Sequence, residues 1–175
     1  SADGMEVTIF RPSVIFGAGD SFLNLFARLL RWFPLMPLGG ATARFQPVFV
    51  EDVARCIVDS LQRPASFGKT YELCGPRVYT LRELVEYVGA LTGHPRPVIA
   101  LPGILAYMQA ALLEFAPGKL MSRDNLRSMQ VDNVCAACPL PFGLQPTPLE
   151  AVAPAYLAAH FPRARYQPFR ASARR

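Results

Sequence analysis

The chain has 175 residues, a length that suits one ordinary domain and is too short for two of full size. Apolar residue types make up 51% and charged types 18%, so a buried core is expected and general disorder is excluded. The 17 prolines and 12 glycines follow no period, which excludes a collagen-like repeat.

The net charge of +5 is confined to the C-terminal end of the sequence. Residues 163–175 contain five arginines and no acidic residue, and the remaining basic residues balance the 13 acidic ones. A neutral body with a basic tail does not form a nucleic-acid-binding face. We expect this tail to be a solvated terminus, and contact with an anionic membrane surface or an acidic partner is the alternative.

The first third of the chain predicts strands on either side of one helix. Residues 7–10 form an apolar strand that needs neighbours on both sides, and Arg11-Pro12 interrupts it before a second strand at 14–16. Apolar residues then recur with helical spacing over 22–33, after the possible caps Asp20 and Ser21. A loop at 34–43 and a strand at 45–50 follow.

A short helix is predicted next, because two acidic residues occupy its electropositive first turn. Pro64 would stop it. Its two acids are Glu51 and Asp52, and its predicted buried stripe is Val53, Ala54, Ile57, Val58 and Leu61.

The second half of the chain continues the alternation of strands and helices. A strand at 70–73 precedes a capping box, Thr80 to Glu83, which opens a helix that ends at Gly93. A strand at 97–101, a buried helix at 103–115 and a helix at 122–130 follow. A second capping box at 147–150 begins a last helix, which runs to about 160. This alternation indicates an α/β fold, although its strands are few for a complete sheet.

Four cysteines are present, and two of them have metal-ligand or redox spacing. Cys135 and Cys138 lack the further ligands that zinc requires, because the only histidines are His94 and His160. Proline follows Cys138 directly, which does not fit a thioredoxin-like motif. We therefore predict free thiols in a reducing compartment and no metal site.

Two motifs of nucleotide-dependent oxidoreductases are absent from the sequence. No Gly-x-Gly-x-x-Gly occurs, and Gly17-Ala-Gly19 lacks the third glycine. A Tyr-x-x-x-Lys pair is also absent, because Ala65 and Phe115 stand four residues before the two lysines. No catalytic residue can be assigned, so this chain alone is not expected to be catalytic.

An ordered set of segments nevertheless carries a clear resemblance. It consists of TIFRPSVIFG at 8–17, FQPVFVEDVA at 45–54, TYELCGP at 70–76, YTLREL at 79–84 and MSRDNLRSMQVDNV at 121–134. This set resembles the C-terminal half of extended and atypical short-chain dehydrogenase/reductases, the NAD(P)-dependent epimerase/dehydratase family. Within that family it is similar to the branch of the complex I accessory subunit and its bacterial relatives.

The resemblance implies the C-terminal part of a Rossmann-like fold with a small helical substrate-side domain. Residues 1–62 would be the last strands and helices of an incomplete NAD(P)-binding domain, and 63–162 a small mixed α/β substrate-side region, followed by the basic tail. The glycine-rich loop and the Tyr-x-x-x-Lys helix would belong to a missing N-terminal half. Binding of NAD(P), as NADPH or NADH, would require that half.

The resemblance also implies site residues. Physical reasoning agrees, because a proline removes one ladder donor at a strand end and ligands bind at the C-terminal ends of parallel strands. Arg11 is expected to pair with Asp52 or Glu51 and tie its strand to the next helix. The cofactor-binding candidates are Pro12, Ser13, Val14 and Ile15, and the substrate-pocket candidates are Arg44, Gln46 and Phe49.

The functional expectation is a binding and assembly role as the substrate-side half of an NAD(P)-binding protein related to the accessory subunit of NADH:ubiquinone oxidoreductase. The alternative is part of an active NAD(P)-dependent sugar epimerase, dehydratase or reductase. A third possibility is a membrane-surface module that uses the apolar helix at 103–115 and the basic tail. Expected partners are the missing half, a second copy, a respiratory complex or an anionic membrane surface. The expected location is cytoplasmic, or peripheral to the inner membrane on its cytoplasmic or matrix side.

Overall fold

The structure is a computed structural model that describes residues 6–114, 131–136 and 139–158. The predicted helix at 122–130 and the basic tail lie outside these residues. The elements in chain order are β1 (Ile9–Pro12), β2 (Ile15–Phe16), α1 (Phe22–Trp32), β3 (Met36–Leu38), β4 (Arg44–Phe45), β5 (Val48–Phe49), α2 (Val50–Leu61), a 3-10 turn (Pro64–Ser66), β6 (Thr70–Leu73), β7 (Tyr79–Thr80), α3 (Leu81–Thr92), β8 (Val98–Ala100), α4 (Gly103–Glu114), a second 3-10 turn (Pro141–Gly143) and α6 (Leu149–Leu157).

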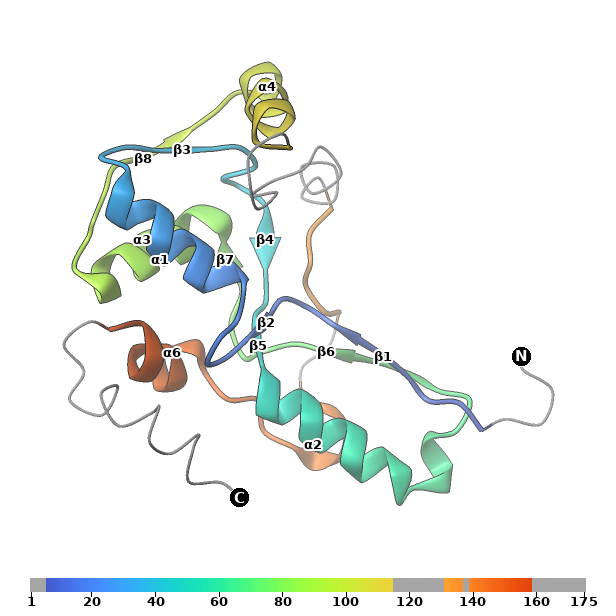
Figure 1. Cartoon of the computed structure of the whole chain (residues 1–175). Coiled ribbons are helices and arrows are strands. Elements are labelled where there is room, and N and C mark those ends of the chain that lie inside the picture. Colours follow the sequence, from blue (N-terminus) through green and yellow to red (C-terminus); the bar gives the residue numbers. More distant parts are fainter. Residues whose placement is uncertain (1–5, 115–130, 137–138, 159–175) are drawn as a thin grey trace.

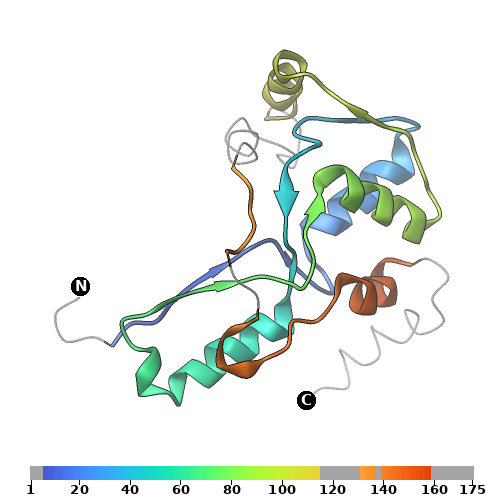
Figure 2. The ribbon, with the colours of Figure 1, turned by 180° about the vertical axis from the view of Figure 1, so that it is seen from behind.

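The described strands pair in two-stranded ladders, most of them parallel. β1 pairs with β6, β2 with β5 and β3 with β8 in parallel, while β4 and β7 are antiparallel. The β1–β6 ladder lies along α2, and α1 lies beside α3 with the β3–β8 ladder above them (Figures 1 and 2). Parallel strands connected through helices confirm the predicted α/β class. The division of the chain at 62 remains a prediction.

Helix α1 is the element that local sequence specifies best. The backbone N–H of Leu23 donates to Oδ1 of Asp20 at 2.6 Å, so Asp20 rather than Ser21 supplies the cap. Phe26 and Leu30 of the predicted apolar stripe are buried. Leu23, which the predicted stripe did not include, is also buried, whereas Phe33 of the stripe is 54% exposed. The helix ends at Trp32, before Pro34.

Two strand boundaries differ from the predictions. β1 continues through Arg11 and Pro12, which were expected to interrupt it, and Pro12 ends the ladder at a position opposite Leu73. The predicted strand at 45–50 is divided at Gln46-Pro47 into β4 and β5, and α2 already begins at Val50. A strand-end proline removes only one backbone donor, so pairing survives there.

A third strand, β3, lies inside the segment predicted as a loop. Its residues pair in parallel with β8, and the N–H of Met36 donates to the carbonyl oxygen of Pro97 at 3.0 Å. Met36 and Leu38 are buried, whereas Pro37 between them is exposed. The prediction was wrong because the partner strand is far away in sequence, and proline-rich composition alone favoured a loop.

Helix α2 buries a different face from the one predicted. Of the predicted apolar stripe only Val53 is buried, while Ile57, Val58 and Leu61 are 44%, 56% and 75% exposed. Asp52 and Cys56 lie on the buried side instead, at 2% and 0% exposure. Asp52 is held on the buried side by hydrogen bonds from Thr147, which lies just before α6.

Helix α3 confirms its predicted caps. The hydroxyl of Thr80 accepts from the N–H of Glu83 at 3.2 Å, and the Glu83 carboxylate accepts from the N–H of Thr80 at 2.7 Å. The hydrogen bonds that the Glu83 carboxylate accepts from the N–H and the hydroxyl of Thr80 lower the pKa of Glu83 below its ordinary value. Gly93 adopts φ 74°, the left-handed conformation that ends helices.

The second predicted capping box does not form. Pro148 is the N-cap residue of α6, and the Thr147 side chain makes no cap. Thr147 instead donates to Asp52, and Glu150 accepts from the hydroxyl of Tyr79. The side chains of Thr147 and Glu150 therefore bind residues that are distant in sequence instead of capping the helix.

Helix α4 begins near the predicted position but is not buried as expected. Ala106 is 2% exposed, whereas Ile104, Leu105 and Met108 are 80%, 50% and 56% exposed. Within the described ranges, no helix combines the length and apolar character needed to cross a bilayer.

Two apolar clusters hold the described residues together. The larger one gathers Phe16 and residues of α1, β3, α3 and α6, and the smaller one surrounds Cys56 of α2. Both clusters draw residues from before and after position 62. The strand ends described next lie between them, so both sides of the candidate site are anchored by apolar contacts.

Candidate functional site

The candidate site lies where β1 and β6 end and the chain passes to β2 and β5. The N–H of Ser13 donates to the carbonyl oxygen of Leu73 at 2.9 Å, and the N–H of Val48 donates to that of Val14 at 2.9 Å. These hydrogen bonds place the predicted cofactor segment at the C-terminal ends of parallel strands. Ligands of open α/β sheets bind at such ends.

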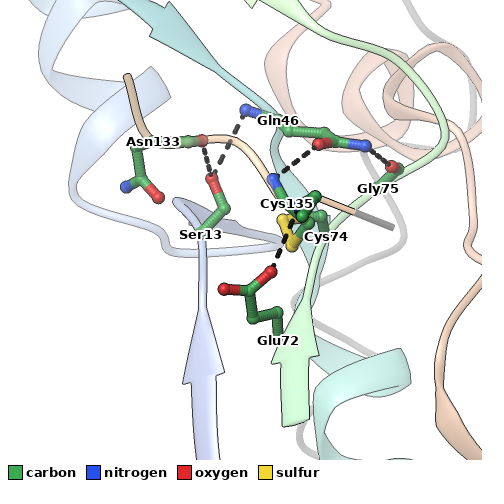
Figure 3. The surroundings of a disulfide bond; sticks show 8 residues. Ser13, Gln46, Glu72, Cys74, Gly75, Asn133 and Cys135 are labelled. Atoms are coloured by element: carbon green, nitrogen blue, oxygen red, sulfur yellow. Dashed lines mark hydrogen bonds between the residues drawn. A yellow bond between two sulfur atoms is a disulfide. The ribbon is translucent and has the colours of Figure 1, made fainter. Parts of the chain in front are cut away.

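Gln46 occupies the centre of this site and connects three segments (Figure 3). Its Nε2 donates to the carbonyl oxygen of Gly75 at 2.7 Å, and its Oε1 accepts from the N–H of Cys135 at 3.0 Å. Its backbone N–H points to the carbonyl oxygen of Asn133 at 3.1 Å and to the hydroxyl of Ser13 at 3.3 Å. At 4% exposure, Gln46 is a buried polar clamp with both ends of its amide satisfied.

Gly75 is required beside this clamp for steric reasons. A Cβ atom at this position would lie 1.9 Å from the carbonyl oxygen of Pro47, far inside contact distance. The two backbones can approach this closely only at glycine. Gly75 thereby lets the segment after β6 lie directly against the break between β4 and β5.

A disulfide joins Cys74 to Cys135 at the same place, which corrects the prediction of free thiols for these two residues. Their Cα atoms are 6.0 Å apart, an ordinary spacing for a disulfide, and the cysteines are 61 residues apart in sequence. An isolated bridge between Phe45 and Asn133 aligns the segment that carries Cys135. The Cys-x-x-Cys spacing relates Cys135 to Cys138 and not to Cys74, and Cys138 lies outside the described residues.

Cys56 is a free thiol, as predicted. Burial, together with the nearby carboxylates of Asp52 and Asp59, raises the pKa of Cys56 to about 11. A thiol with this pKa is uncharged at neutral pH and is a poor nucleophile or metal ligand. Among the described residues, no group of three or more His, Cys, Asp or Glu side chains could hold a metal ion.

The four predicted cofactor-binding residues differ in their surroundings. The Ser13 hydroxyl donates to the carbonyl oxygen of Asn133 at 2.8 Å, so protein atoms already engage it (Figure 3). Val14 is half-buried against the larger cluster, whereas Pro12 and Ile15 are exposed. Pro12 and Ile15 are therefore the accessible residues of the four, and the cofactor role of the segment stays a prediction.

The three predicted substrate-pocket residues do not share one environment. The side chain of Arg44 is exposed, and its backbone N–H donates to Oδ1 of Asp132 at 3.3 Å. Phe49 is half-buried against Phe16, with ring centroids 5.6 Å apart. Gln46 is buried, so Arg44 is the one polar side chain of the three that is exposed. The substrate role of the three residues stays a prediction.

The expected ion pair of Arg11 with Asp52 or Glu51 is replaced by another contact. Both carboxylate oxygens of Asp52 accept from Thr147, from its N–H at 2.7 Å and from its hydroxyl at 3.1 Å. Arg11 is exposed, and in the described part of the chain it forms no ion pair with either acid. The buried carboxylate is thus satisfied by neutral donors, which tie α2 to the start of α6.

Two tyrosine–carboxylate hydrogen bonds also tether α6, and sequence reasoning missed both. Tyr79 donates to Glu150 at 2.7 Å and Tyr156 donates to Asp20 at 2.8 Å. Burial and the neighbouring carboxylates raise the pKa of both phenols, so they stay protonated donors. Arg77 lies 5.0 Å from the Tyr79 ring centre and 3.6 Å from Glu150. No local spacing signals contacts between residues this far apart.

Comparison with known proteins shows what the chain is similar to. No family model matches the chain. It is 36% identical over 153 residues to the rat protein named NADH dehydrogenase (ubiquinone) 1 alpha subcomplex subunit 9, mitochondrial, covering 83% of this chain and 40% of that protein. It is 39% identical over 117 residues to the Arabidopsis thaliana protein of the same name, covering 66% of this chain and 29% of that protein. The chain thus spans well under half the length of the curated relatives it matches.

A solved structure supports the fold. An epimerase from Methanothermobacter thermautotrophicus superposes with a TM-score of 0.51 at 18% identity, covering 75% of this chain and 40% of that one. This likeness concerns the fold alone, and it agrees with the α/β class and parallel ladders described above. The chain is therefore similar in sequence to the alpha subcomplex subunit 9 proteins of NADH dehydrogenase over 83% of its length, and it shares an α/β fold with the epimerase.

Proposed function

We propose that this chain forms the substrate-side portion of an NAD(P)-binding, short-chain-dehydrogenase-like protein whose role in NADH:ubiquinone oxidoreductase is binding and assembly. The observation that carries the proposal is the similarity to the subunit 9 proteins over 83% of the chain, which spans 40% of the rat relative. The names of these relatives favour association with a respiratory complex in mitochondria. We extend the same association and a peripheral, matrix-side location to this chain.

The absence of a glycine-rich phosphate loop from the sequence supports division of the cofactor site between two portions. This chain would supply the strand ends at residues 12–15, where Pro12 and Ile15 are exposed and can meet a nicotinamide ring. The Gln46 clamp and the Cys74–Cys135 disulfide hold that segment in place through Ser13 and Asn133. A second portion would supply the phosphate cradle. The NAD(P) site is thereby complete only when both portions meet.

Two uncovered features support docking of the second portion against β1 and α2. The described β1 strand pairs on one side only, with β6, although parallel sheets are normally buried and continuous. On α2, the side chains of Ile57, Val58 and Leu61 form an exposed apolar face. An unpaired strand edge beside an apolar helix face is a surface that another part of a protein covers.

Co-expression with the remaining part of the rat relative tests this docking. We expect the two portions to co-elute in size-exclusion chromatography, and the double variant Ile57→Glu, Leu61→Glu to abolish co-elution because it places two charges in the apolar face. The matched control is Ile104→Glu, Met108→Glu, which has the same spacing on the exposed face of α4. Equal co-elution of all three forms would show that α2 is not the docking face.

A further inference from the structure

A short segment, residues 131–136, crosses the candidate site, and we name it the strap. Neither of the two apolar clusters of the described residues includes any part of it. Val131 is 74% exposed, and Asp132, Asn133 and Ala136 are exposed as well. The burial of apolar side chains, which holds the helices together, therefore contributes little to the position of the strap.

Hydrogen bonds attach the strap to the strand ends. The N–H of Asn133 donates to the carbonyl oxygen of Arg44 at 2.8 Å, and the carbonyl oxygen of Asn133 accepts from the Ser13 hydroxyl at 2.8 Å. The N–H of Ala136 donates to Oε2 of Glu72 at 3.2 Å (Figure 3). Because water can replace either partner of such a hydrogen bond, each one adds only modestly to the stability of the attached strap.

The disulfide is the covalent attachment of the strap. Cys74 directly follows β6 and is 4% exposed, whereas Cys135 lies in the strap and is half-buried. Solvent therefore reaches the Cys135 end of the disulfide more readily than the Cys74 end. In compartments where thiol reductants are present, a disulfide is usually transient or redox-sensing. This last step rests on the matrix-side location proposed above.

We propose that the Cys74–Cys135 disulfide is a redox switch, which fixes the strap on the strand ends when oxidised and releases it when a dithiol reduces it. A thiolate of the dithiol attacks Sγ of Cys135, the S–S bond breaks, and Cys74 leaves as a thiolate. The second thiol of the reductant then displaces Cys135 from the mixed disulfide. The two protein sulfurs take up the two protons that the reductant gives up, so the products are two protein thiols and one oxidised dithiol.

Release of the strap changes the polar groups of the candidate site. The Ser13 hydroxyl no longer donates to the carbonyl oxygen of Asn133, and Oε1 of Gln46 loses the donor N–H of Cys135. The Ser13 hydroxyl is then able to donate to water or to a ligand at the strand ends. The oxidised chain thus keeps this end of the site covered, and the reduced chain uncovers it.

Hydrogen exchange measured by mass spectrometry tests the switch on the full chain of 175 residues, with and without dithiothreitol. We expect peptides that contain 131–136 to exchange at least roughly tenfold faster after reduction, while peptides of α3, which the larger cluster holds, stay unchanged. The double variant Cys74→Ser, Cys135→Ser should exchange fast at the strap without reductant and show no further response to it. The matched control Cys138→Ser keeps both bridge cysteines and should respond as the unmodified chain does.

Three results would overturn the proposal. The first is unchanged exchange of the strap after alkylation has shown that both thiols are free, because hydrogen bonds alone would then hold the strap. The second is a bridge that stays closed in excess dithiothreitol, because a reductant could then not reach it. The third is equal loss of protection in α3, because the disulfide would then hold the whole fold. None of these results depends on NAD(P) or on the second portion, so failure of the proposed function is distinguishable from failure of the switch.

Discussion

The carboxylate of Asp52 in α2 accepts two hydrogen bonds from Thr147, which is 95 residues away in sequence. Asp52 is 2% exposed, so this pair fixes which face of α2 is buried and joins that helix to the start of α6. The apolar residues of α2 that periodicity assigned to the core are turned outward as a result. One buried polar contact thereby creates the apolar face that we assign to docking.

Replacing Asp52 with alanine should lower the free energy of unfolding by about 2 kcal/mol, because a buried charged acceptor with two donors is lost. Urea denaturation followed by circular dichroism measures the change. Glu51→Ala is the matched control, since Glu51 is exposed in the same helical turn and should change stability by less than about 0.5 kcal/mol. Equal effects of the two variants would contradict the role given to Asp52.

Replacing Gln46 with leucine should lower the free energy of unfolding by about 2–4 kcal/mol, because the carbonyl of Gly75 and the N–H of Cys135 both lose their partner. Hydrogen exchange should show faster exchange of the Cys135 amide in the variant. The control is Gln62→Leu, in which the glutamine directly after α2 is exposed. An unchanged Cys135 exchange rate would show that Gln46 is not the clamp.

The Cys74–Cys135 disulfide should appear in a non-reducing peptide map, with Cys56 as a free thiol. Cys74→Ser should lower the free energy of unfolding by about 2–4 kcal/mol, because a loop of 61 residues is then open in the unfolded chain. Cys56→Ser offers a comparison that leaves the bridge intact. Full alkylation of Cys74 and Cys135 without reductant would contradict the pairing.

The stability should fall as the pH rises from about 9 towards 11, in the range where Cys56 titrates. Its pKa rises from 9.0 to about 11 on folding, so the folded chain holds the thiol proton more tightly than the unfolded chain does. The stabilisation is therefore complete below pH 9 and is lost as the pH passes the folded value. The variant Cys56→Ala should lack this part of the pH dependence, as urea midpoints between pH 8 and pH 11 would reveal. Coincident profiles for both proteins would contradict it.

Local sequence predicted the elements whose ends are fixed locally. The caps of α1 and α3 at Asp20, Thr80 and Gly93 involve residues within one helical turn, so their motifs could be recognised directly. By contrast, β3 forms because β8 pairs with it, and the capping box at Thr147 fails because Asp52 takes the hydroxyl. In both places a contact between residues distant in sequence determines the local structure.

The candidate site divides in the same way. The family resemblance pointed to the segments that meet at the strand ends, and the structure brings Ser13 and Gln46 together there. The resemblance could not reveal that the segment with Asn133 and Cys135 packs against these strand ends. A β-bridge and a disulfide between residues 61 apart leave no periodic pattern in the sequence. The contacts of Gln46 could not be predicted for the same reason. Its side-chain amide and its backbone N–H bind residues of segments that are distant from it in sequence.

The central claim is that this chain supplies one part of an NAD(P) site that a second portion completes. Isothermal titration with NADPH tests it most directly, on the chain alone and on its complex with the remaining part of the rat relative. The account predicts no low-micromolar binding to residues 1–175 alone and clear binding to the complex. Low-micromolar binding of NADPH to the isolated chain would contradict the account.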